Sequence, residues 1–92
     1  MAIRLNSQFA KAYGSRAHIY LNKKQYDQAI VDCSKAIRLD PNDAVAYVNH
    51  GVAYKLQGNK AEAIANFEKA ITLSDNPHVI KMAEQQIKEL SR

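Results

Sequence analysis

Histidine and cysteine are among the side chains of this sequence that could bind a metal ion or act as a nucleophile near neutral pH. The three histidines, His18, His50 and His78, stand far apart, with no paired spacing and no neighbouring pattern of cysteine or acidic ligands. The sequence also contains no glycine-rich phosphate loop, no HExxH and no carboxylates placed to share acid and base roles. We therefore expect no metal, no cofactor and no catalysis by this chain. The remaining enzymatic alternative is a docking or regulatory segment of a larger enzyme.

The single cysteine, Cys33, has no partner for an internal disulfide. It stands within a run of apolar residues at helical spacing, which favours an inert packing thiol over a reactive one. Among the histidines, His18 is the best candidate for a hydrogen-bonding role at a binding surface.

The charge pattern argues against nucleic acid and membrane partners. Thirteen basic and nine acidic side chains in 92 residues give a net charge of +4, and the basic residues are scattered rather than clustered.

The apolar runs are far shorter than the roughly 18 residues that a membrane-spanning helix needs, and the first residues lack the apolar core of a secretory signal. We expect a soluble protein, with the cytoplasm favoured as its compartment.

Small and apolar residues recur at a spacing of 34 residues. The recurring pairs include Tyr13 and Tyr47, Tyr20 and Tyr54, Ala29 and Ala63, Ile30 and Ile64, Ala36 and Ala70, and Leu39 and Leu73. The residues between them vary freely, so the repeat preserves a packing scheme rather than a reaction centre. A period of this length is typical of helical repeat proteins.

Within each period the apolar residues follow each other at steps of three and four, which predicts two amphipathic helices. We expect helices at about 8–21, 26–39, 43–56 and 60–73. Gly58 should end the third helix in a left-handed conformation, and Lys24 should occupy the same place in the first copy at a cost of up to about 1 kcal/mol. Asn42 or Asp43 should cap one helix, and Asn76 followed by Pro77 should begin another.

The two ends of the chain differ from the repeats between them. Residues 2–6 match residues 36–40, which suggests that residues 1–8 are the tail of a truncated preceding repeat. Residues 9–43 and 44–77 form the two full copies. Residues 78–92 carry one apolar stripe and one polar face, as expected of a helix that covers the last repeat. The predicted fold is therefore all-α, a solenoid of antiparallel helix pairs closed by a capping helix.

The pattern resembles the tetratricopeptide repeat family over residues 2–77. The positions that carry the resemblance are Tyr13 and Tyr47, Ala17 and Gly51, Tyr20 and Tyr54, Ala29 and Ala63, Ala36 and Ala70, and Pro41. Arg16 and His50 depart from it by replacing the usual leucine, and Cys33 replaces an aromatic residue that Phe67 retains.

The resemblance implies a concave groove, lined by the first helix of each pair, that holds a peptide or a segment of a partner protein. Carried onto this sequence, the implied partner-binding residues are Lys11, His18, Asn22, Val45, Val48, Asn49, Val52 and Lys55, with Gly14, Leu21 and Leu56 beside them. Some family members grip a terminal carboxylate with lysine and asparagine side chains. Asn49 fits that scheme, but Gly14, His18, Val79 and Ala83 occupy the other places, so we do not expect such a clamp.

Two questions stay open from the sequence. Val45, Val48 and Val52 leave the helix at 43–56 apolar nearly all round, so this face is either covered by the capping helix or exposed as the floor of the groove. Self-association is the alternative function, because Phe9, Tyr13 and Tyr20 lie on a first helix without a preceding neighbour. It would occur through this exposed helix or through exchange of a helix pair between chains.

Overall fold

The computed structural model describes residues 7–91, and these residues form five α-helices and no strand. The helices follow one another through short turns: α2 (Ser7–Asn22), α3 (Tyr26–Leu39), α4 (Ala44–Gln57), α5 (Lys60–Leu73) and α6 (Pro77–Leu90). Each expected helix is present within one residue of its predicted ends. The predicted repeat tail at residues 1–8 lies almost entirely outside the described residues, and Ser7 and Gln8 belong to α2.

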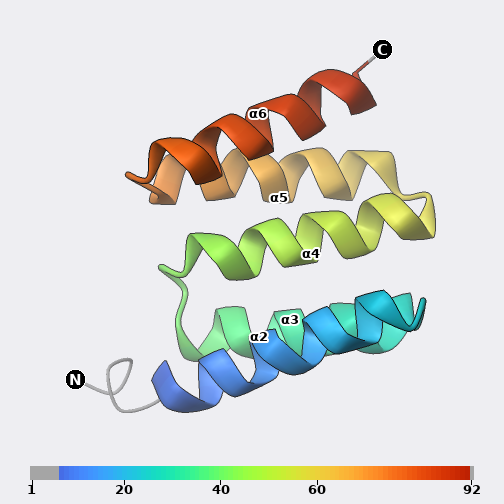
Figure 1. Cartoon of the computed structure of the whole chain (residues 1–92), viewed down its shortest axis with the longest axis vertical. Coiled ribbons are helices and arrows are strands. Elements are labelled where there is room, and N and C mark those ends of the chain that lie inside the picture. The colour runs from blue at the N-terminus through green and yellow to red at the C-terminus, as the bar shows by residue number, and fades with distance from the viewer. Residues whose placement is uncertain (1–6, 92) are drawn as a thin grey trace.

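The helices stack in chain order into an elongated molecule. In Figure 1 the stack begins with α2 and α3, continues with α4 and α5, and ends with α6. The helices α2 and α3 form one antiparallel pair and α4 and α5 the next, while α6 packs mainly on α5. The extents of 41, 29 and 18 Å describe a slab rather than a sphere. The all-α repeat solenoid expected from the sequence is confirmed.

Side-chain caps define where two of the helices begin. The Asp43 Oδ1 accepts a hydrogen bond of 3.0 Å from the backbone N–H of Val45, and the Asn76 Oδ1 accepts one of 2.9 Å from that of His78. Each cap satisfies a backbone donor that has no partner within the helix. Of the two capping residues considered for α4, Asp43 is the one that caps. Asn76 caps α6 with Pro77 in its first turn, as predicted.

The turn inside each helix pair uses a left-handed residue. Gly58 has a φ of +92° after α4, and Lys24 has a φ of +62° at the equivalent place after α2. Glycine adopts this conformation without a steric penalty, whereas the Cβ of lysine costs up to about 1 kcal/mol. The predicted strain at Lys24 is therefore confirmed in position and kind.

The core is built mainly from alanines, which let the helices approach closely. One buried cluster joins α4, α5 and α6 and contains Ala44, Val48, Ala63, Phe67, Ala70 and Ala83. A second cluster joins α2, α3 and α4 and contains Ala17, Ala29, Cys33 and Ala53. Phe67 is fully buried against Gly51, where a Cβ would lie 3.0 Å from the Phe67 ring. Gly51 thus gives α5 the space for its largest core side chain.

Cys33 occupies the place in the first repeat that Phe67 occupies in the second. Its side chain is fully buried, and burial raises the pKa of its thiol to about 12. The neighbouring Asp32 carboxylate contributes in the same direction. Cys33 is therefore a packing residue, because a protonated and buried thiol is a poor nucleophile.

No helix formed by residues 7–91 combines the length and the apolar character that crossing a bilayer would need. Nor do the side chains in this range form any group of three or more histidine, cysteine or acidic residues that could share a metal ion.

Candidate protein-binding groove

An open groove of about 750 Å³ runs between α2 and α4. Its walls come from the first helix of each pair and from the residue that caps α4. The lining residues are Lys11, Gly14, Ser15, His18 and Ile19 on one side and Asp43, Val45, Ala46 and Asn49 on the other. Both helices belong to the same stack, and the groove is already open in this structure.

The two walls differ in polarity at equivalent positions. Residues 11, 15 and 18 lie on one face of α2, since steps of four and three residues return to the same side of a helix. They are Lys11, Ser15 and His18. At the positions 34 residues later the α4 wall has Val45 in place of Lys11 and Asn49 in place of Ser15, whereas Val52 lies outside the groove lining. The α2 wall thus carries a basic residue where the α4 wall carries an exposed apolar one.

Two large apolar side chains in this groove are open to solvent. Ile19 is 51% exposed and Val45 is 53% exposed. Exposed apolar surface next to polar groups is typical of sites that bind another molecule.

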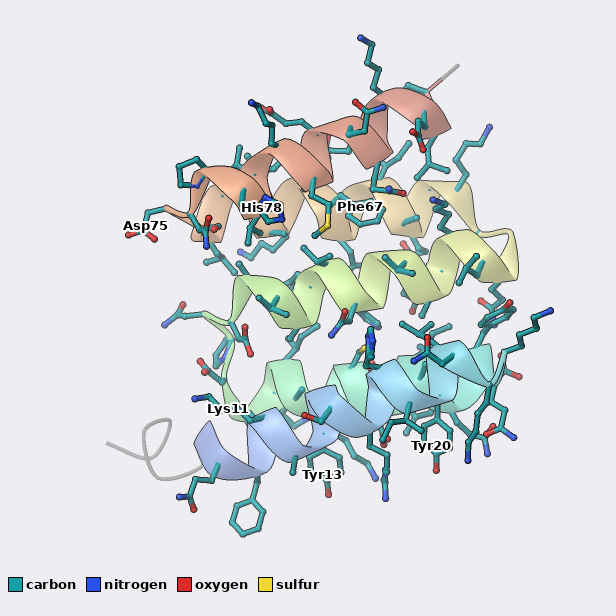
Figure 2. All side chains as sticks on the ribbon, viewed as in Figure 1. Lys11, Tyr13, Tyr20, Phe67, Asp75 and His78 are labelled. Carbon is teal, nitrogen blue, oxygen red and sulfur yellow. The ribbon has the colours of Figure 1, made fainter. Side chains whose placement is uncertain are left out.

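The groove contains one lysine near the start of α2 and one aspartate at the start of α4. Lys11 forms no ion pair with any residue in the range 7–91, so its ammonium group is available to a partner. Asp43 is the groove's carboxylate, but one of its oxygens already accepts the hydrogen bond from the backbone N–H of Val45. Figure 2 shows Lys11 near the turn that leads from α3 into α4.

Comparison with known proteins identifies the repeats. Residues 10–43 and residues 44–77 each match a family model described as tetratricopeptide repeat. The chain belongs to the tetratricopeptide repeat family. This membership supports a protein–protein interaction module.

Similar tetratricopeptide repeats occur in much longer proteins. The chain is 33% identical over 72 residues to the small glutamine-rich tetratricopeptide repeat-containing protein 2 of Saccharomyces cerevisiae. The aligned residues make up 78% of this chain and 21% of that protein. It is 30% identical over 70 residues to the DnaJ homolog subfamily C member 7 homolog of Dictyostelium discoideum, covering 76% of this chain and 13% of that protein.

A solved structure supports the same fold. The tetratricopeptide repeat domain of Arabidopsis OM64 superimposes with a TM-score of 0.77 at 31% sequence identity, over 87% of this chain and 66% of the other. The two repeats and most of the stack therefore follow the arrangement of that domain.

The groove brings together four of the eight partner-binding residues predicted from the sequence. Lys11, His18, Val45 and Asn49 line it. Asn22 is exposed at the end of α2, outside the lining. Partner contacts of all eight residues stay predictions.

The other three predicted residues of this tetratricopeptide repeat array face the capping helix. Val48 is only 6% exposed and belongs to the cluster that contains Ala83 of α6, and Val52 packs against the same cluster. Lys55 donates a hydrogen bond to Gln86 of α6. The structure thus divides the valine face of α4. Val45 remains on the groove, whereas Val48 and Val52 have α6 as their neighbour.

Sequence reasoning did not place Ser15, Ile19, Asp43 and Ala46 in the groove, although they line it. The 34-residue period could have indicated Ser15, because Ser15 is the equivalent of Asn49, which was predicted to line the groove. Ile19 stands 34 residues before Ala53, which is fully buried. Ile19 is exposed because no helix formed by residues 7–91 packs on it as α2 and α3 pack around Ala53.

A polar pair joins the two helices of each tetratricopeptide repeat, at the position where the family usually has leucine. In the first repeat, the Arg16 Nε and Nη2 donate to the two carboxylate oxygens of Asp32 at 2.6 and 2.9 Å. Asp32 is 2% exposed, and its charge is balanced by this bidentate pair. The hydrogen bonds and charge of Asp32 raise the pKa of the Arg16 guanidinium.

In the second repeat, His50 and Asn66 take these two positions and form a neutral pair. The Asn66 Nδ2 donates to the backbone oxygen of Glu62, so its Oδ1 faces the His50 Nδ1 at 2.9 Å. We infer that the Nδ1–H of His50 donates to Asn66. Its Nε2, at 3.3 Å, then accepts from the Ser34 hydroxyl of the first repeat. His50 therefore links both repeats when its imidazole is neutral.

Acidification should weaken this link. Burial lowers the pKa of His50 below its ordinary value of 6.5, so the unfolded chain binds the proton more tightly than the folded chain. The contribution of His50 to stability is complete above about pH 6.5 and is lost as the pH falls through 6.5 and then through the folded-state pKa. We expect the thermal midpoint to fall between pH 7.5 and 5, and a His50→Gln variant to show a shallower fall in thermal melts.

The matched control for this prediction is His18→Gln, which changes an exposed histidine in the groove. The fall of the midpoint in His50→Gln should be shallower than in this variant, since it is His50 that joins the two repeats. Equal slopes for His50→Gln and the original chain would contradict a role of His50 in the pH dependence.

The side of α2 that faces away from α4 carries the residues predicted for self-association. Phe9 is 63% exposed and forms a shallow pocket with Ala12, Tyr13 and Arg16. Figure 2 shows Tyr13 and Tyr20 extending from α2 on this side. Tyr20 also packs against the buried cluster of α2, α3 and α4, so part of its surface is already covered.

Proposed function

We propose that this tetratricopeptide repeat module holds a segment of a partner protein in the groove between α2 and α4. The observation that carries the proposal is the combination of exposed apolar and polar side chains in one groove. Exposed Val45 and Ile19 offer apolar contact, while Lys11, His18 and Asn49 offer a charge and hydrogen bonds in the same lining. A partner segment would bury the former and orient itself by the latter.

A matched pair of variants tests this proposal. Val45→Asp places a carboxylate in the groove, and Val31→Asp places the same group on α3, outside the groove lining. Val45 is 53% exposed and Val31 is 52% exposed, so both variants should fold. Each variant and the original chain are used to select binders from a phage-displayed library of random peptides.

The original chain and the Val31→Asp variant should enrich the same peptides, and the Val45→Asp variant should bind them at least about tenfold more weakly. That loss corresponds to the removal of one buried apolar contact. Equal binding by both variants would exclude the groove as the binding site.

Self-association through the first helix is a second candidate, supported by one comparison within the chain. Ala12 is exposed, whereas Ala46, its equivalent in the second repeat, is 2% exposed. Ala12 is therefore exposed at a position that is buried between the repeats in the second copy. Light scattering tests this candidate. It is supported if the measured mass rises with concentration and if the Phe9→Asp variant keeps the monomer mass. A monomer at every concentration would exclude it.

A further inference from the structure

Gly14 is the one glycine among the residues that line the groove. The residue 34 positions later is Val48, which is 6% exposed and packs in the cluster that contains Ala83 of α6. In the second repeat a branched apolar side chain therefore stands between α4 and α6. In the first repeat the same place is part of the groove.

The space at Gly14 is open. A Cβ built on Gly14 would meet no other atom within 4 Å. By contrast, a Cβ on Gly51 would lie 3.0 Å from the Phe67 ring. Gly51 is thus required by close packing, whereas nothing in the fold occupies the space that Gly14 leaves.

We propose that this space is a pocket for one branched apolar side chain of the bound segment, and that Lys11 binds a carboxylate next to it. This inference rests on the proposed function and names the chemistry of the partner. The internal comparison supplies the size of the side chain, because Val48 fills the equivalent place. The charge of Lys11, one helical turn before Gly14 on the same wall, supplies the acidic neighbour. The occupant is an acidic peptide segment with a valine, isoleucine or leucine as its anchor.

The geometry also explains why the anchor should dominate recognition. The groove lining on α4 includes Ala46 and Asn49, a small residue and a hydrogen-bonding amide. An apolar side chain placed between Gly14 and this wall would leave water and contact both helices. Ser15, His18 and Asn49 lie around this point and can bind the polar backbone of the same segment.

The test fills the pocket with the side chain that the second repeat uses. Gly14→Val should weaken binding of the peptides selected by the original chain by about 10- to 100-fold, since the anchor contact is lost. Its thermal midpoint should stay equal or rise, because glycine is a poor residue inside a helix and the new side chain meets open space. Loss of binding is then separated from loss of fold.

Three further variants sharpen the result in the same phage-displayed random-peptide selection. Ala65→Val adds a comparable side chain on the exposed side of α5 and should leave binding unchanged. Gly14→Ala should weaken binding less than Gly14→Val, because it fills the pocket only in part. Lys11→Glu should remove the enrichment of aspartate and glutamate beside the apolar anchor.

The outcomes distinguish this inference from the proposed function. If Gly14→Val enriches the same peptides as the original chain with similar affinity, while Val45→Asp does not, the pocket is wrong and the groove stands. If Val45→Asp also keeps those peptides, or if the original chain enriches none, both proposals fail. A fall in the thermal midpoint of Gly14→Val would contradict the open space at Gly14.

Discussion

Replacing Phe67 with alanine should lower the free energy of unfolding by about 3 to 5 kcal/mol, the usual cost of emptying a fully buried aromatic site. Phe67 is 0% exposed and contributes the largest side chain of the cluster that joins α4, α5 and α6. A domain typically has about 5 to 15 kcal/mol of stability in total. We therefore expect chemical denaturation followed by circular dichroism to show a much earlier midpoint.

The matched control is Phe9→Ala, which removes the same side chain at a site that is 63% exposed. It should change stability by no more than about 0.5 kcal/mol. Gly51 supplies a second check, because its missing Cβ is what makes room for the Phe67 ring. Gly51→Ala should destabilise the original chain but do less harm in the Phe67→Ala background. Equal effects of Gly51→Ala in both backgrounds would contradict this contact.

The second large effect is expected at α6. Ala83→Asp should destabilise the chain by several kcal/mol, because it places a carboxylate without a partner at a fully buried site between α6 and the last repeat. The expected result is a large fall in the thermal midpoint. At a pH below the ordinary pKa of aspartate, part of the loss should return as the new carboxyl group becomes neutral.

The neighbouring Met82→Asp variant is the control for Ala83→Asp. Met82 is 40% exposed, so a carboxylate there can remain in water, and the thermal midpoint should change little. Similar midpoints for the two variants would show that α6 does not cover the repeat in solution. The assignment of Val48 to the core would then be wrong as well, since α6 supplies its cover.

Local features of the fold could be predicted because they depend on residues close in sequence. The helices follow from apolar spacing, the turn at Gly58 from glycine, and the cap at Asn76 from an asparagine before a proline. The strained Lys24 followed from the 34-residue period, which placed it at the position of Gly58.

The division of the α4 valines could not be predicted in the same way. Helical spacing places Val45, Val48 and Val52 on neighbouring faces, but the angle at which α6 crosses the stack decides which of them it covers. That angle depends on contacts between distant residues. The same limit explains why the sequence predicted five of the nine groove residues, Gly14 among them, and omitted Ile19, whose exposure depends on what lies beside α2.

The polar pairs were missed for another reason. Arg16 and His50 were recognised as departures from leucine, but their partners Asp32 and Asn66 stand 16 residues away on a different helix. Many charged and amide residues lie at comparable separations, and only the packing of the two helices selects one.

These pairs also bear on how a chain with two similar repeats folds into one topology. The first helices share most of their small and aromatic residues, and so do the second helices. Pairing of α2 with α5 would nevertheless place Ala17 where the Phe67 ring needs the space left by Gly51. In the wrong pairing, Arg16 would meet the amide of Asn66, and the carboxylate of Asp32 would lie far from the guanidinium that balances its charge. Because a buried carboxylate without a partner is costly, the Arg16–Asp32 pair also favours the pairing of α2 with α3.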